Sequence, residues 1–197
     1  MSLTTLGLAL PTDPRWVDIA GMKLADILID HAYCEQKAAS SCISLIVHYP
    51  QKVKLVETLT PIVAEEWGHF QRVLKELKKR NIPLGNQRKD EYVKKISEFL
   101  VKKGKEQEVL LDRLLFCALI EARSCERFKI LSENLQEPEL QKFYRELMVS
   151  EAGHYRTFIE LAEEYVNPEL VRSRWKEILQ KEAETLKDME IRGDRMH

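Results

Sequence analysis

The sequence of 197 residues has few of the residues that form turns and cross-links: seven glycines, seven prolines and four cysteines. So little glycine and proline favours long helices over a turn-rich β fold. A run of about 18 apolar residues is lacking, so no membrane-spanning helix is expected. The start, MSLTTLGLALPTDPRW, also lacks the basic and apolar regions of a signal peptide. We therefore expect a cytoplasmic protein that does not enter a membrane. The net charge of −1 does not distinguish one class of partner from another.

The cysteines form no CxxC pair, which argues against a zinc ribbon or a rubredoxin-type iron site. They are Cys34, Cys42, Cys117 and Cys125. All four fall within apolar helical patterns, where a free cysteine behaves as a small hydrophobic residue. We predict buried, reduced thiols in a reducing cytoplasm.

Apolar residues recur at intervals of three and four in four long stretches, near residues 21–50, 55–77, 110–132 and 140–165. Pro61 should either kink the second helix or mark its start. Residues 1–20 indicate an irregular arm, residues 81–103 a polar crossover with a short helix, and residues 169–197 a weaker helix with a loosely packed polar tail. No stretch alternates with a period of two. The pattern predicts a single all-α domain over 1–197: a four-helix bundle of two helical hairpins joined by a long crossover, with additional helices.

Six polar residues occupy positions where the apolar stripe calls for leucine or alanine: Glu35, Glu66, His69, Glu121, Glu151 and His154. Four of them form two Glu-x-x-His motifs, EWGH and EAGH, whose members lie one turn apart on one helix face. The spacing repeats, because Glu66 follows Glu35 by 31 positions and Glu151 follows Glu121 by 30. Each predicted hairpin therefore offers one glutamate on its first helix and a Glu-x-x-His pair on its second.

This inventory of four carboxylates and two imidazoles is typical of di-iron and di-manganese carboxylate bundles. A mostly oxygen donor set suits such ions better than Cu(I) or structural zinc. Two divalent cations would balance four buried carboxylates, and carboxylates that shift between bridging and terminal binding leave coordination positions open for O2. We predict that the six residues bind two metal ions. We also predict that Gly68 lets a neighbouring helix or a substrate approach closely.

Other interpretations of these glutamates remain open. Each could reach solvent or pair with a buried arginine such as Arg123 or Arg127, which would leave a metal-free helical interaction module. Glu126 is the main rival of Glu121, although only Glu121 keeps the hairpin spacing. Glu65 should point toward solvent.

Polar residues near the predicted ligands could support them. His31, one turn before Glu35, could bind metal, support a ligand or belong to the core. Asp30 and Glu126 could accept the second N–H of the ligating histidines.

The stretches LIDHAYCEQKAASSCISLI, EEWGHFQRVLK, FCALIEARSCERFKIL and SEAGHYRTF resemble the bacterial tRNA-(2-methylthio-N6-isopentenyladenosine) hydroxylases, a branch of the ferritin-like di-iron superfamily. The resemblance covers roughly residues 20–165, and IEARSCERF is its most specific part. It implies that the six residues bind two iron ions and that the protein is a monooxygenase. The implied reaction is O2-dependent hydroxylation of the prenyl side chain of a modified adenosine in tRNA. Gly68, Gly153 and the tail EIRGDRMH depart from the family pattern, and a changed tail could change the substrate.

The resemblance also implies partners. No GxGxxG fingerprint for a flavin or nicotinamide is present, so an external electron donor, a reductase or a ferredoxin, is expected. The candidate tRNA surface consists of basic residues of the crossover, which could equally form an ordinary solvated face: Lys78, Lys79, Arg80, Arg88, Lys89, Lys94, Lys95, Lys102, Lys103 and Lys105. The alternative functions are another ferritin-like di-iron oxidoreductase, such as a peroxidase, ferroxidase or desaturase, and the metal-free module.

Overall fold

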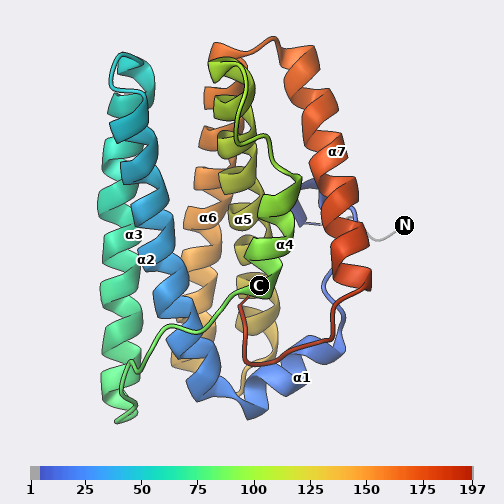
Figure 1. Cartoon of the computed structure of the whole chain (residues 1–197). Helices are drawn as coiled ribbons and strands as arrows, with labels where there is room; N and C mark the ends of the chain where they lie inside the picture. The colour runs from blue at the N-terminus through green and yellow to red at the C-terminus, as the bar shows by residue number, and fades with distance from the viewer. Residues whose placement is uncertain (1–4, 197) are drawn as a thin grey trace. The chain divides into compact units, whose positions relative to one another are not determined.

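The computed structural model describes residues 5–196, and these residues contain helices and no strand (Figure 1). The elements are η1 (Thr5–Gly7), α1 (Arg15–Met22), α2 (Leu24–His48), α3 (Val53–Lys79), α4 (Glu91–Phe99), α5 (Glu106–Asn134), α6 (Pro138–Tyr165) and α7 (Pro168–Lys187). Two compact units are present, the α2–α3 unit (residues 18–89 and 192–196) and the α5–α6 unit (residues 5–17 and 90–191). The all-α prediction is confirmed, whereas the single domain stays a prediction.

In the α2–α3 unit, the two long helices lie side by side as a hairpin (Figure 1). Helix α2 ends just before Pro50, as expected because the residue before a proline disfavours the helical conformation. Helix α3 begins at Val53 and runs through the exposed Pro61, so the alternative that Pro61 marks its start is wrong. Residues spaced along the facing stripes are fully buried, which joins the two helices through an apolar seam: Ile27, Leu28, Ala32, Leu55, Leu59 and Val73.

The C-terminal tail is firmly anchored in the α2–α3 unit, which corrects the prediction that it packs loosely. The carboxylate of Asp30 accepts hydrogen bonds from Nη1 of Arg195 and the backbone N–H of Met196, both at 2.7 Å. A Cβ atom at Gly193 would lie 2.3 Å from a side-chain carbon of Ile19, so only glycine fits there. Gly193, Arg195 and Met196 of the tail are buried, and the charges of Arg192, Asp194 and Arg195 are paired.

In the α5–α6 unit, a three-residue connection joins α5 to α6, and Pro138 occupies the first turn of α6, where its missing N–H costs nothing. Helices α4 and α7 pack against one another, and α7 also contacts α5 and α6. Arg174 of α7 donates from Nε and Nη2 to the buried Asp112 of α5 at 2.8 and 2.7 Å. The short crossover helix and the C-terminal helix predicted from the sequence are both present.

The predicted irregular arm contains two helical elements, η1 and α1, so that prediction is wrong in part. Pro11 and Pro14 prevent a helix only in the residues before them. Helix α1 begins directly after Pro14, at Arg15. Trp16 is 2% exposed, and the guanidinium of Arg127 lies 4.7 Å from the centre of its ring. Burial of a tryptophan under a cation therefore holds the start of α1.

A buried ionic cluster connects the arm, α4 and α7 to α5. Arg123 donates from Nε and Nη2 to Glu182 at 2.9 and 2.6 Å, from Nη2 to the carbonyl of Leu10 at 3.0 Å, and from Nη1 to Glu126. Thr12 donates to Glu126 from its hydroxyl at 2.6 Å, and Tyr92 donates to Glu182 at 3.0 Å. Burial raises the pKa of Glu182, although Arg123 opposes the shift. Charges that would be costly alone are thus satisfied together.

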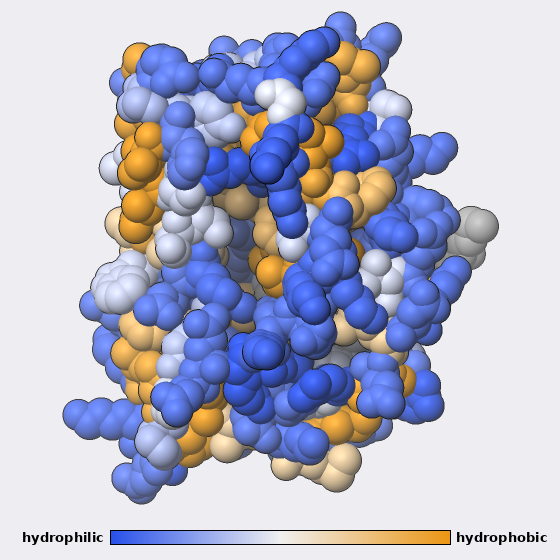
Figure 2. All heavy atoms as spheres, in the orientation of Figure 1, coloured by the Kyte–Doolittle hydropathy of each residue, from blue (hydrophilic) through white to orange (hydrophobic). Residues whose placement is uncertain are grey.

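The described surface is largely polar. In the view of Figure 2, hydrophilic residues cover most of the molecule and smaller hydrophobic areas lie between them. Among residues 5–196, no helix is long and apolar enough to cross a bilayer. The four cysteines are buried and form no disulfide, as predicted.

Replacing Arg123 by methionine should strongly destabilise the protein, because Glu126 and Glu182 would keep buried charge without their cation. Breaking a buried pair in this way typically costs about 3–5 kcal/mol. Unfolding in guanidinium chloride measures the loss. Lys129→Met, at an exposed position of the same helix, should stay within about 0.5 kcal/mol of the parent, and an equal loss in both variants would contradict the role of the cluster.

Candidate functional site

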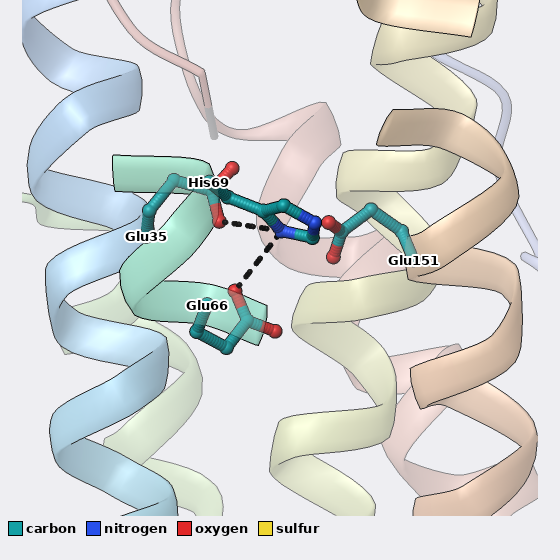
Figure 3. A group of neighbouring side chains, drawn as sticks. All are labelled: Glu35, Glu66, His69 and Glu151. Atoms are coloured by element: carbon teal, nitrogen blue, oxygen red, sulfur yellow. Dashed lines mark ion pairs between the residues drawn. The ribbon is translucent and has the colours of Figure 1, made fainter. Parts of the chain in front are cut away.

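Three predicted ligands meet inside the α2–α3 unit. Glu35 comes from α2, and Glu66 and His69 come from α3, one turn apart (Figure 3). Their exposed fractions are 4%, 0% and 7%. Nδ1 of His69 lies 3.6 Å from a carboxylate oxygen of Glu35 and 3.6 Å from one of Glu66. One donor atom from each residue can be chosen so that all three lie within 4.8 Å of one another. We refer to these residues as the α2–α3 triad.

Within the α2–α3 triad, Glu35 and His69 shift each other's pKa. Burial alone would lower the pKa of His69, but the nearby carboxylates of Glu35 and Glu66 outweigh burial and raise it to about 9. Burial alone would raise the pKa of Glu35, yet the contacts with His31 and His69 hold it well below its usual range. The buried carboxylates therefore favour the protonated form of the His69 imidazole.

The other three predicted ligands meet inside the α5–α6 unit. Glu121 comes from α5, and Glu151 and His154 come from α6. They are 4%, 2% and 4% exposed, and Nδ1 of His154 lies 3.9 Å from a carboxylate oxygen of Glu151. Their donor atoms also lie within 4.8 Å of one another. This α5–α6 triad repeats the composition of the α2–α3 triad, as the duplicated spacing predicted.

His31 supports the α2–α3 triad directly. Its ring is fully buried, and its Nε2 lies 2.6 Å from Oε1 of Glu35, one turn farther along α2. Oε2 of Glu35 is the oxygen near His69. Of the three roles left open for His31, the structure thus favours that of a positioning residue, which holds one carboxylate oxygen while the other faces His69.

Comparison with known proteins connects this arrangement to one family. Residues 3–197 match the model of the family tRNA-(MS[2]IO[6]A)-hydroxylase (MiaE). The chain belongs to this family. A relative from Pseudomonas putida KT2440 is 36% identical over 187 residues, which cover 91% of this chain and 90% of the relative. A relative from Salmonella typhimurium LT2 is 37% identical over 111 residues, 56% of this chain and 40% of the longer relative. Both are named tRNA 2-(methylsulfanyl)-N(6)-isopentenyladenosine(37) hydroxylases.

The fold also has a solved counterpart. Protein 43 from Synechococcus, with aldehyde deformylating oxygenase activity, is 34% identical and superposes with a TM-score of 0.91 over 96% of this chain and 94% of that one. The predictions of a ferritin-like fold and of a tRNA hydroxylase family are confirmed.

The donor sets of this MiaE family member fit iron. The donor atoms of each triad lie within 4.8 Å of one another, close enough for one ion to draw them together. Two carboxylates and one imidazole per triad match the inventory of carboxylate-bridged di-iron bundles. The buried carboxylates and histidines thus support iron binding, whereas the assignment of each of the six as a ligand stays a prediction.

Most polar neighbours have other roles. Asp30 bonds to the tail, and Glu126 bonds to Thr12 and Arg123, so the prediction that these carboxylates orient the ligating histidines is wrong. The same bonds remove Glu126 as a rival of Glu121. Glu65 is exposed, as predicted.

The role predicted for Gly68 needs a correction. A Cβ atom there would meet no described atom within 4 Å, so the prediction that a neighbouring helix approaches closely is wrong. The prediction that a substrate approaches there remains untested. The anchoring of the tail by Asp30 had no local sequence signal, because its partners are 165 and 166 positions away.

Loss of the His31 contact should weaken metal binding. Removing an outer hydrogen-bond partner of a ligand typically lowers affinity 10- to 100-fold. We expect the affinity for cobalt to fall by this factor in His31→Leu. His31→Gln keeps an N–H donor, so it should retain most of the affinity and the visible spectrum of the bound ion. His48→Leu, at an exposed position of α2, is the control. Equal affinities of His31→Leu and the parent would contradict the positioning role.

Proposed function

We propose that this protein hydroxylates the prenyl side chain of 2-methylthio-N6-isopentenyladenosine in tRNA. The observation that carries the proposal is the family match across residues 3–197, together with the name of the Pseudomonas putida relative, which covers nine-tenths of both chains. The reaction inserts one atom of O2 into a C–H bond and releases the other as water. A tRNA substrate also supports the expected cytoplasmic location.

Six residues would hold two iron ions in this proposal: Glu35, Glu66, His69, Glu121, Glu151 and His154. We propose that the two triads contribute to one dinuclear centre, because each triad alone has the donors of half a di-iron site. When bound, iron would activate O2 as the oxidant of the C–H bond. Four carboxylates and two divalent cations sum to zero, which offsets the cost of burying the acids.

The residues of the chain have separate tasks around that centre. His31 fixes the orientation of Glu35 through its 2.6 Å contact. His69 must lose its proton before it binds an ion, since only the neutral imidazole nitrogen is a ligand. Apolar side chains on the same helices as the ligands, such as Leu28, Leu59 and Phe158, are each at most 1% exposed and would limit the access of water.

Two electrons and two protons must enter for each turnover, because one oxygen atom leaves as water. The sequence contains no dinucleotide fingerprint, so we propose that a separate reductase or a ferredoxin delivers the electrons. This protein would then be the oxygenase component of a two-protein system.

The crossover lysines remain a candidate surface for tRNA phosphates, but part of the predicted set has protein partners. Lys79 and Arg80 pair with Glu76 at 2.8 and 2.7 Å, and Arg88 pairs with Asp26 and Asp194. The exposed members with no such contact are Lys78, Lys89, Lys95, Lys102 and Lys103. Phosphate contacts by these residues would make affinity depend on salt.

A second candidate function follows from the Synechococcus protein, whose name includes aldehyde deformylating oxygenase activity. An aldehyde substrate would use the same donors and fold, as would the other di-iron activities that the sequence left open. The choice of substrate therefore needs a direct test.

That test is nucleoside mass spectrometry of tRNA from cells that make the prenylated adenosine but lack a hydroxylase. Expression of the parent chain should increase the mass of that nucleoside by one oxygen atom. Glu66→Ala should lower the product at least about 100-fold, as expected when a metal ligand that supplies several kcal/mol is lost. Glu65→Ala, its exposed neighbour, should retain the product.

If the folded, iron-loaded parent leaves the nucleoside unchanged, the proposed substrate is wrong, and conversion of a long-chain aldehyde would establish the second candidate. Product from Glu66→Ala at the level of the parent would contradict the assignment of that ligand.

A further inference from the structure

Trp67 is an exposed aromatic residue within the first Glu-x-x-His motif. Successive residues of a helix differ by about 100° in direction, so Glu66 is fully buried while Trp67, the next residue, has 46% of its surface exposed. It is the only aromatic residue among the large apolar residues exposed in residues 5–196. An indole that stays in water gives up the free energy that burial of its large apolar surface would contribute. The exposed position of Trp67 on α3 therefore calls for an explanation.

The indole is held from one side and open on another. The ring of Phe70 lies 4.9 Å from it, centre to centre, at an angle of 43°, and Phe70 is itself 8% exposed. Ala64, one turn earlier, and Gly68, the next residue, have little or no side chain, and a Cβ atom at Gly68 would meet no described atom within 4 Å. A planar ligand could therefore reach the indole without displacing a long side chain.

The same outward face of α3 becomes basic toward its end. From Ala64 onward it presents Trp67, Gln71, Lys75 and Lys78, and it contains no acid. Both lysines are exposed, and neither ammonium group has an ion pair or hydrogen bond with another described residue. At 1.5 Å per residue they lie about 12 and 17 Å along the helix from Trp67. Lys79, in contrast, is bound by Glu76.

The metal motif does not require this tryptophan. The second motif, EAGHY, has Ala152 in the same position and still brings Glu151 and His154 together in the α5–α6 triad. The aromatic residue after its histidine, Tyr155, lies against Trp175 of α7, 5.9 Å between ring centres. Trp67 is thus a local addition to a duplicated motif and needs a function of its own.

We propose that Trp67 stacks against an unpaired base of the tRNA and that Lys75 and Lys78 bind phosphates of the same strand. The proposal rests on the proposed function and adds a surface to it. Single-stranded nucleic acids are bound by this combination of an aromatic platform and a basic path. The base is a neighbour of the reacting adenosine, since Trp67 points away from the triad. A protein partner would need a larger apolar area than one indole flanked by alanine, glycine and glutamine.

Affinity for a dye-labelled anticodon stem-loop, measured by fluorescence anisotropy with the metal-loaded full chain, tests the proposal. From the typical contribution of one stacked base, the affinity of Trp67→Ala for the stem-loop should be about 5- to 150-fold lower than that of the parent. The affinity of Trp67→Phe should lie between the two. The loss should be the same for stem-loops with and without the prenyl group. Metal content should remain that of the parent.

The lysines are tested by the dependence of affinity on salt. Each phosphate contact in a single strand contributes about 0.7 to the slope of log affinity against log salt, so the double variant Lys75→Ala/Lys78→Ala should reduce that slope by about 1.4. Lys79→Ala, whose ammonium group is already paired with Glu76, is the matched control and should change it little.

The outcomes separate this inference from the function on which it rests. If the parent chain binds no stem-loop, both the proposed tRNA substrate and the proposed role of Trp67 are wrong. If the parent binds and Trp67→Ala binds equally well, the platform alone is wrong. The platform is also wrong if Trp67→Ala alters self-association in size-exclusion chromatography while RNA affinity stays constant, because the indole would then serve a protein contact.

Discussion

Buried negative charge is the constraint on which this structure depends. The helices bury glutamates that belong on a surface, and each must be neutralised where it lies. Two solutions occur in the described residues. Glu126 and Glu182 share the guanidinium of Arg123, which stabilises the arm and α7 against α5. Glu35 and Glu66 instead lie against His31 and His69, groups that can neutralise an acid or, in the case of His69, bind metal with it. The first solution is structural, and the second leaves donor atoms suited to a cation.

Local periodicity explains which parts of this structure could be predicted from the sequence. Stripes with a period of three to four located the long helices, and polar residues on those stripes identified both triads, since residues one turn apart must share a face. Helix α1 was missed because the prolines before it suggested an irregular arm. The anchoring of the tail by Asp30 and the capture of Glu126 by Thr12 join residues more than 100 positions apart. No local pattern encodes such contacts, so the partners assigned to Asp30 and Glu126 were wrong.

Family membership and geometry support different parts of the functional account. The match over residues 3–197 supports the reaction and its tRNA substrate, whereas the triads support the chemistry that such a reaction needs. The Synechococcus structure, with a TM-score of 0.91, shows that a closely similar fold accompanies a different printed activity. The fold alone therefore does not determine the substrate. Trp67 and the lysines that follow it on α3 are our candidates for that choice, because the second copy of the motif brings Glu151 and His154 together without an equivalent tryptophan.

The central proposal is that the six buried residues of the two triads bind a pair of iron ions. Metal analysis combined with Mössbauer spectroscopy of the oxidised, iron-loaded protein tests it most directly. The account predicts about two iron ions per chain and a spin-coupled pair with a diamagnetic ground state. Two magnetically isolated ions would show that each triad acts alone, and a chain that binds no iron would contradict the account altogether.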